Sequence, residues 1–186
     1  MIAYHGTVVG DIQILKPFAH PLSNLQQPVV YLSTIKALSV IYIWNKRYKW
    51  MTYEIRDDGM PVYNETFKNG LSYFYSGVKG YIYICDANFY PEKDNTRSNI
   101  VISKEPVEIR NVEVVENAYE RILKFESERQ IVINRFDELS DEIRRREQKM
   151  VLDSIRNLEL WKMERPLSDF VAEKFPDLWE EALRSL

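Results

Sequence analysis

Short apolar runs separated by polar residues fill the first two thirds of the chain and predict β-strands. The clearest is Gly80–Cys85, which is rich in aromatic and β-branched residues. Asp57-Asp58-Gly59 lies between two further apolar runs, Trp50–Ile55 and Met60–Tyr63, and indicates a hairpin. The other predicted strands are Ile2–Val9 (interrupted by His5-Gly6-Thr7), Val29–Leu32, Ile100–Ile102 and Val107–Val115.

One of these strands runs directly into a predicted helix. The segment Pro28–Tyr42 reads as the strand Val29–Leu32 followed by a helix over Thr34–Arg47, with Ser33 or Thr34 as its N-cap. Apolar residues cover nearly every side of that helix, so we expect it to be buried. A shorter helix is predicted over Thr66–Ser76.

After Val115 the pattern becomes helical and strongly charged. Apolar residues recur at helical spacing until Arg165-Pro166, and Leu167–Leu186 is predicted to form one last amphipathic helix. The chain is therefore predicted to be α+β, with a body over 1–115 and a C-terminal helical subdomain over 116–186 packed on it. That subdomain either covers the sheet or docks a partner.

Composition narrows the class of protein. The 186 residues are 45% hydrophobic and 28% charged, as in ordinary soluble domains, and the net charge of −3 gives no electrostatic case for nucleic acid or an anionic membrane. The single cysteine, Cys85, excludes an internal disulfide, and two histidines make a zinc site unexpected. The N-terminus has no signal-peptide pattern and no segment approaches a membrane span. We expect a cytoplasmic protein without a metal.

Two groups of residues carry candidate chemistry. His5-Gly6 is either an exposed histidine beside a bulge or a ligand clamp, in which imidazole donates to a hydroxyl and glycine lets the backbone approach an amide. Ser39 and Tyr42 share one helix face, and Tyr31 precedes the helix. The alternative is that both tyrosines belong to the core and Ser39 bonds back to the preceding turn.

Taken together, two motifs in this sequence resemble those of the ADP-ribosyltransferase fold. The first is His-Gly-Thr near the N-terminus, and the second is Tyr-Leu-Ser-Thr, with a Ser and a Tyr eight and eleven residues after its Tyr. The likeness is to the poly(ADP-ribose)-polymerase-like and diphtheria-toxin-like branch with its His–Tyr–Glu signature, over residues 2–45 and then by order of elements. It implies a split β-sheet body that uses NAD as substrate. By this resemblance His5 holds the adenosine ribose, Gly6 and Ser39 bind the nicotinamide carboxamide, and Tyr31 and Tyr42 enclose the ring. The implied NAD-binding residues are His5, Gly6, Thr7, Tyr31, Ser33, Ser39 and Tyr42.

The third motif of the family departs from its pattern here. The family places a glutamate at the start of a late strand, where a carboxylate stabilises the oxocarbenium-like centre of the reaction. The matching positions in this chain hold Ser98 or Asn99. Glu105 is the candidate catalytic acid, and the other carboxylates that could face the ribose are Glu65 and Glu108.

Two functions follow from these residues. The first is transfer of ADP-ribose from NAD to an unknown protein or nucleic-acid acceptor. The second is a catalytically inactive nucleotide-binding or protein-interaction module of the same fold. A related activity, RNA 2′-phosphotransfer, needs several basic residues, for which the sequence offers only His20 and Arg47 nearby.

Overall fold

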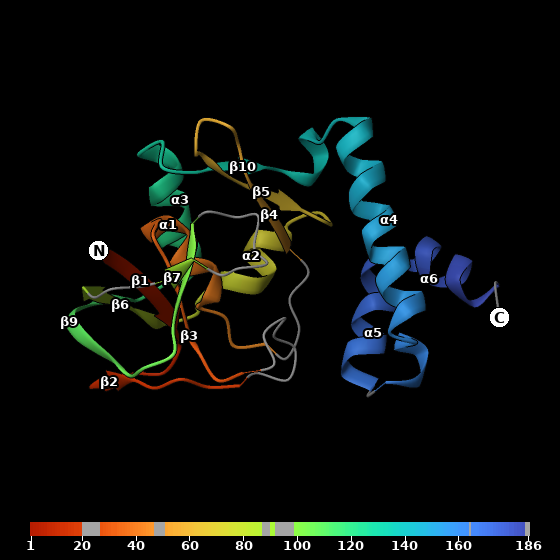
Figure 1. Cartoon of the computed structure of the whole chain (residues 1–186). Helices are drawn as coiled ribbons and strands as arrows, with labels where there is room; N and C mark the ends of the chain where they lie inside the picture. Colours follow the sequence, from red (N-terminus) through yellow and green to blue (C-terminus); the bar gives the residue numbers. More distant parts are fainter. Residues whose placement is uncertain (20–26, 47–50, 87–89, 92–98, 164, 185–186) are drawn as a thin grey trace. The chain divides into compact units, whose positions relative to one another are not determined.

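A computed structural model gives the fold as a mixture of helices and strands, so the predicted α+β class is confirmed (Figure 1). It describes residues 1–19, 27–46, 51–86, 90–91, 99–163 and 165–184, and His20, Arg47 and Ser98 lie outside this part. The chain forms two compact units. Unit 1 comprises 1–45, 55–61 and 75–131, and unit 2 comprises 46–54, 62–74 and 132–186. This division does not follow the predicted boundary at 115, because most of the hairpin groups with the C-terminal helices.

Unit 1 is built on a seven-stranded sheet in the order β2-β9-β6-β1-β3-β8-β7. Every neighbouring pair is antiparallel. Apolar side chains on one face of this sheet, among them Ala3, Leu32 and Val101, form a buried cluster. The strands are β1 (Ile2–Thr7), β2 (Ile14–Leu15), β3 (Val30–Ser33), β6 (Gly80–Asp86), β7 (Tyr90–Pro91), β8 (Ile100–Ser103) and β9 (Val107–Val115).

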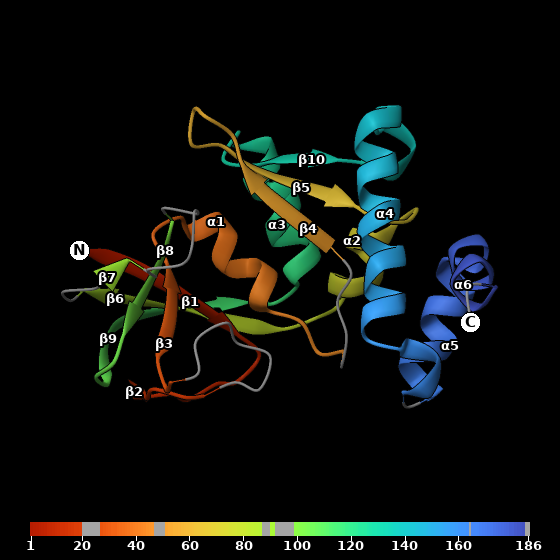
Figure 2. The same ribbon diagram turned by 45° about the vertical axis from the view of Figure 1, so that its right-hand side comes forward.

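The strand pairs in the middle of the sheet differ in how many positions they pair. β1 pairs with β6 over its whole length, from Ile2 to Thr7, without the predicted interruption. β1 and β3 pair at a single register position, Tyr4 opposite Ser33, whereas β3 continues to pair with β8 over four positions. In the described structure β1 and β3 are therefore paired at the end of β3 that adjoins α1, and they part along the rest of β3, toward Val30. Figure 2 shows these two strands and α1.

The helix after β3 is much shorter than predicted. The structure has α1 over Lys36–Ser39 and one 3-10 turn over Val40–Tyr42, so the predicted extension to Arg47 is wrong. Three β-branched residues within four positions weaken helix propensity, and the chain leaves the helical conformation at Ile43. The predicted burial of α1 is confirmed, since Ala37, Leu38 and Ser39 are buried.

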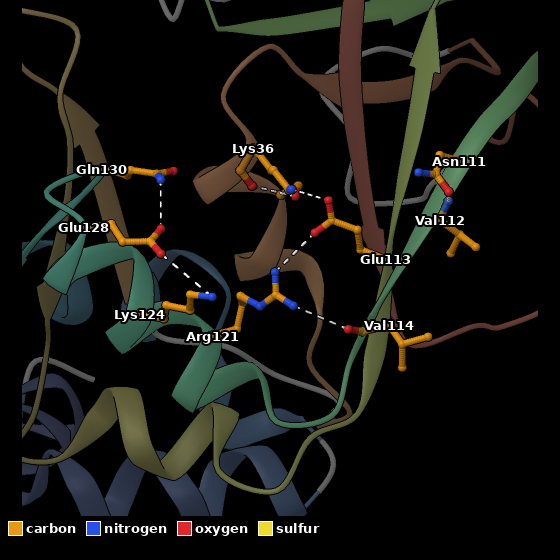
Figure 3. A network of polar contacts seen from close by, with 10 residues as sticks. Lys36, Asn111, Val112, Glu113, Val114, Arg121, Lys124, Glu128 and Gln130 are labelled. Atoms are coloured by element: carbon orange, nitrogen blue, oxygen red, sulfur yellow. Dashed lines mark hydrogen bonds and ion pairs between the residues drawn. The ribbon is translucent and has the colours of Figure 1, made fainter.

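An ion cluster fastens α1 to the sheet. Glu113 of β9 pairs with Lys36 of α1 and, at 3.2 Å, with Arg121 of α3 (Ala118–Ser127), and Figure 3 shows the three side chains converging. Partial burial opposes the charge of Glu113, yet the two cations hold the pKa of this carboxyl below its usual range. α1 is thus anchored at its first residue.

Unit 2 contains a three-stranded sheet in the order β10-β5-β4, formed by β4 (Met51–Ile55), β5 (Pro61–Glu65) and β10 (Val132–Asn134). The hairpin predicted from Asp57-Asp58-Gly59 is confirmed, with Gly59 at a φ of +81° that favours glycine. β10 lies parallel to β5. β10 was not predicted, because a three-residue strand between helices leaves almost no periodic pattern.

The helices of unit 2 are α2 (Gly70–Tyr75), α4 (Asp141–Asn157), α5 (Arg165–Lys174) and α6 (Pro176–Leu183), with 3-10 turns over Phe136–Glu138 and Leu160–Lys162. The single last helix predicted over Leu167–Leu186 is wrong. Pro176 is the first residue of α6, where its missing N–H is tolerated, so it separates two helices. Phe67, Phe74, Phe170 and Phe175 pack edge to face in the core of this unit.

Candidate functional site

His5 spans the point at which β1 and β3 part. Its Nδ1 lies 2.9 Å from the backbone oxygen of Tyr31. A carbonyl oxygen only accepts, so Nδ1 carries the proton of the neutral ring and Nε2 is left as an acceptor. His5 was predicted to donate to a hydroxyl, whereas Nε2 of this tautomer accepts from one. The histidine is half-buried and is therefore held in one orientation.

The environment of His5 predicts a pH effect on stability. Burial lowers the pKa of the imidazole below its usual 6.5, although the bond to Tyr31 works in the opposite direction. At a pH between the pKa of His5 in the folded protein and its pKa in the unfolded chain, the unfolded chain binds more protons than the folded protein. The free energy of unfolding should therefore fall as the pH drops from 6.5 toward the pKa of the folded protein. Urea unfolding from about pH 7.5 to about pH 5 should show a steeper loss for the wild type than for His5→Gln. Parallel curves would contradict this assignment.

Gly6 is a site of close contact between β1 and α1. A Cβ built on Gly6 would fall on the carbonyl oxygen of Ser39 and 2.7 Å from its carbonyl carbon. Gly80 of the neighbouring strand is similarly tight, with Thr7 O 2.6 Å from such a Cβ. Glycine is therefore required at position 6 by the packing of α1, and the predicted partners Gly6 and Ser39 lie side by side.

The candidate hydroxyl groups all make local hydrogen bonds. Thr7 accepts from the backbone N–H of Val9, and Ser33 binds both the N–H and the carbonyl of Ile35. Ser39 donates to the carbonyl of Lys36 at 2.7 Å, which is the turn-bonding alternative considered for it. A hydroxyl oxygen that donates its proton still offers lone pairs. Ser39 can therefore accept a hydrogen bond, and Thr7 and Ser33 serve mainly to shape the turns.

The two candidate tyrosines stand at opposite ends of the strand-to-helix segment. Tyr31 lies half-buried in β3, and Tyr42 ends the 3-10 turn with 39% of its surface exposed. The ring of Tyr42 is 6.4 Å from that of Trp44 and tilted by 49°. Tyr75 donates to the carbonyl of Ile41, one residue before Tyr42, and burial raises the pKa of its hydroxyl. Tyr42 is thus an accessible aromatic face on a fixed backbone.

Asn99 occupies the end of β8 that adjoins α1. Its backbone oxygen accepts from Thr34 N at 2.8 Å and from Thr34 Oγ1 at 3.3 Å. The side chain is only 3% exposed, yet neither Oδ1 nor Nδ2 has a hydrogen-bond partner within the described part of the chain. Buried amides are normally paired, so two orphaned atoms on one residue are unusual.

The structure places the candidate carboxylates away from Asn99. Glu105 is exposed beyond the other end of β8, where Ser103 lies opposite Val30, and its backbone is bound by the Ser103 hydroxyl. Glu108 is exposed on β9 opposite Ile14. Neither carboxylate reaches the end of β3 that adjoins α1. That end, at Ser33, lies about 10 Å from Val30, given the rise per residue of a β-strand.

Glu65 has a structural role in unit 2. Its carboxylate is buried and accepts from Leu71 N at 2.9 Å and from Phe136 N at 3.1 Å, so it caps α2 and the Phe136 turn together. Sequence reasoning could not find this role, because both donors are brought to Glu65 by tertiary packing.

Glu65→Gln is expected to lower the free energy of unfolding by about 2 kcal/mol, because one buried N–H loses its carboxylate acceptor. Glu105→Gln is the matched control, since that side chain is exposed and should stay within about 0.5 kcal/mol of the wild type. Urea denaturation of both variants measures the difference. Equal free energies of unfolding for the two variants would contradict the capping role of Glu65.

Comparison with known proteins adds no assignment: no family model, curated protein or solved structure matches the chain. Within the described ranges, no group of three or more His, Cys, Asp or Glu side chains could hold a metal ion. None of the described helices is long and apolar enough to cross a membrane.

Proposed function

We propose that this chain is an NAD-binding protein with an ADP-ribosyltransferase-like split sheet, and that it binds NAD without transferring ADP-ribose. The observation that carries the proposal is the His5–Tyr31 bond across the parting of β1 and β3. It sets an imidazole acceptor, Nε2, beside an unpaired stretch of two strands. The order and spacing of the flanking motifs supply the family resemblance.

Each neighbouring group has a role in this reading. His5 Nε2 accepts from a hydroxyl of the adenosine ribose. The carboxamide of nicotinamide lies against the Gly6 backbone, and Ser39 Oγ, which already donates to Lys36, accepts from the amide N–H₂. Tyr31 and the exposed face of Tyr42 enclose the ring.

The proposed absence of ADP-ribose transfer is argued from the lack of a carboxylate at the position of the family's glutamate. Cleavage of the nicotinamide–ribose bond builds positive charge on the ribose, and a carboxylate lowers that barrier. The α1 end of β3 carries the neutral amide of Asn99, whereas Glu105 is exposed beyond the far end of the β3–β8 pair. This favours binding over chemistry.

Calorimetric titration with NAD tests the proposal. We expect binding by the wild type and an affinity at least tenfold weaker in Tyr42→Ala, because stacking on an aromatic side chain contributes about 1–3 kcal/mol. Tyr119→Ala on α3 is the control and should bind as the wild type does. No binding by the wild type, or equal binding by Tyr42→Ala, would refute the proposal.

The absence of transfer has its own test. After incubation with NAD labelled in the adenine, no label should appear on protein or nucleic acid, and free nicotinamide should not accumulate above the level without protein. Steady nicotinamide release would leave NAD binding in place and overturn the inactive assignment.

A further inference from the structure

We infer that the outer edge of β9 is a dimerisation surface, to which a second copy of this chain adds its own β9 in antiparallel orientation. β9 runs from Val107 to Val115, and β2 covers its outer side only at Val107 and Glu108. From Ile109 to Val115, no other strand of the described ranges pairs with that side. An uncovered strand edge presents backbone groups with which another strand can pair.

Two side-chain contacts show which backbone groups point outward from this edge. The N–H of Val112 donates to Oδ1 of the neighbouring Asn111 at 2.8 Å, so it is not used in the ladder with β6. The carbonyl of Val114 accepts from Arg121 at 3.5 Å, which is a long contact (Figure 3). The N–H and C=O of one residue in an antiparallel strand point to the same side. Val112 and Val114 therefore each present a donor and an acceptor outward.

These two residues complement each other when two copies of β9 pair. With Val112 opposite Val114 of the second copy, each such pair exchanges both of its N–H···O=C bonds. The pairing also brings together two apolar side chains that are 44% and 46% exposed in the single chain. Contact between β-branched side chains across strands stabilises a sheet. Two-fold symmetry repeats the same pair on the other side of the axis.

The charges that flank the valines are complementary in the same register. Arg110 falls opposite Glu116 of the second copy, and symmetry places the same pair at the other end. Both side chains are exposed in the single chain, where they pair with Asp86 and Lys79. Opposite charges across neighbouring strands favour pairing. The partner that fits this edge is therefore another β9.

Glu113 lies at the centre of this register, opposite Glu113 of the second copy. Like charges that face each other directly would oppose pairing. Each of these carboxylates is already bound by Lys36 and Arg121 of its own chain. The symmetry axis thus passes between two neutralised clusters, and the cluster that anchors α1 also permits the pairing.

Sedimentation equilibrium of the full chain tests the proposal. The average mass should rise from that of one chain toward that of two between about 5 and about 500 µM, because one strand pair makes a smaller interface than a standard complex. Val112→Pro removes the outward N–H without taking a bond from the β6 ladder, and it should stay at the mass of one chain. Val112→Thr is the matched control, since it keeps the N–H and the β-branched shape, and it should associate. A wild type of constant mass, or a folded Val112→Pro that associates as the wild type does, overturns the proposal.

Charge reversal tests the register and does not depend on tolerance of proline. Arg110→Glu sets a negative charge opposite Glu116 of the second copy and should weaken association about tenfold. The double variant Arg110→Glu/Glu116→Arg restores opposite charges and should associate as the wild type does. Circular dichroism checks that both variants are folded. Unchanged association of Arg110→Glu, or equally weakened association of the single and double variants, overturns the pairing of β9 with itself.

Discussion

Gly6→Ala is expected to lower the free energy of unfolding by about 3 kcal/mol, the upper range for overpacking a buried site. The added methyl group would occupy the position of the Ser39 carbonyl, which belongs to the backbone of α1 and cannot turn aside. α1 would have to move away from β1, although the Lys36–Glu113 ion pair holds its other end. Urea unfolding measures the loss.

Gly70→Ala is the control for this variant. The three atoms nearest to a Cβ at Gly70 belong to the ring of Phe67, at 3.5–3.7 Å, which is ordinary contact. Alanine at this position should leave stability unchanged or raise it by about 0.5 kcal/mol. Full stability of Gly6→Ala together with lost NAD binding would show instead that glycine is needed only for the approach of a ligand.

The sequence predicted those elements whose pattern is local. Gly80–Cys85 alternates aromatic and β-branched residues, and it forms β6 beside β1. Asp57-Asp58-Gly59 carries its turn chemistry in three residues, and the turn is found there. The division of the last helix was also readable, because Phe175-Pro176 contains the residue that cannot continue a helix.

Features set by tertiary contact could not be predicted in this way. The length of α1 was overestimated because apolar residues continue to Trp44, whereas the helical conformation ends at Ile43, which lies against Gly6 and Gly80 of the sheet. Spacing brought His5 and Tyr31 into one hypothesis, but the direction of the hydrogen bond required the fold. Asn99 was visible as a departure from a motif, and only the structure reveals that its amide has no partner in the described chain.

These observations give the site a definite polarity. The imidazole of His5 is neutral, with Nε2 as an acceptor, and Asn99 brings a neutral amide to the motif position where the resembled family has glutamate. Glu113, the carboxylate that anchors α1, is neutralised by Lys36 and Arg121. Among the described carboxylates considered for catalysis, Glu65, Glu105 and Glu108 all lie away from the α1 end of the β3–β8 pair, so none of them supplies a negative charge there.

If NAD binds as proposed, Asn99→Glu places a carboxylate at the third-motif position, and the variant is expected to hydrolyse NAD. The bond between the ribose C1′ and the nicotinamide nitrogen breaks with its electron pair leaving on nicotinamide. A water oxygen bonds to C1′ and releases its proton to solvent. A carboxylate beside the developing cation should raise the rate of nicotinamide release about 100-fold.

Asn99→Gln is the matched control, because it has the length of glutamate without the charge. Chromatographic measurement of nicotinamide should place Asn99→Gln and the wild type at the same background rate, with only Asn99→Glu above it. Asn99→Asp, which has nearly the volume of the native residue, provides a second carboxylate if the longer side chain prevents folding. A background rate in both folded carboxylate variants would mean that position 99 does not face the ribose, because a negative charge within hydrogen-bond reach of that sugar must lower the barrier to the cation.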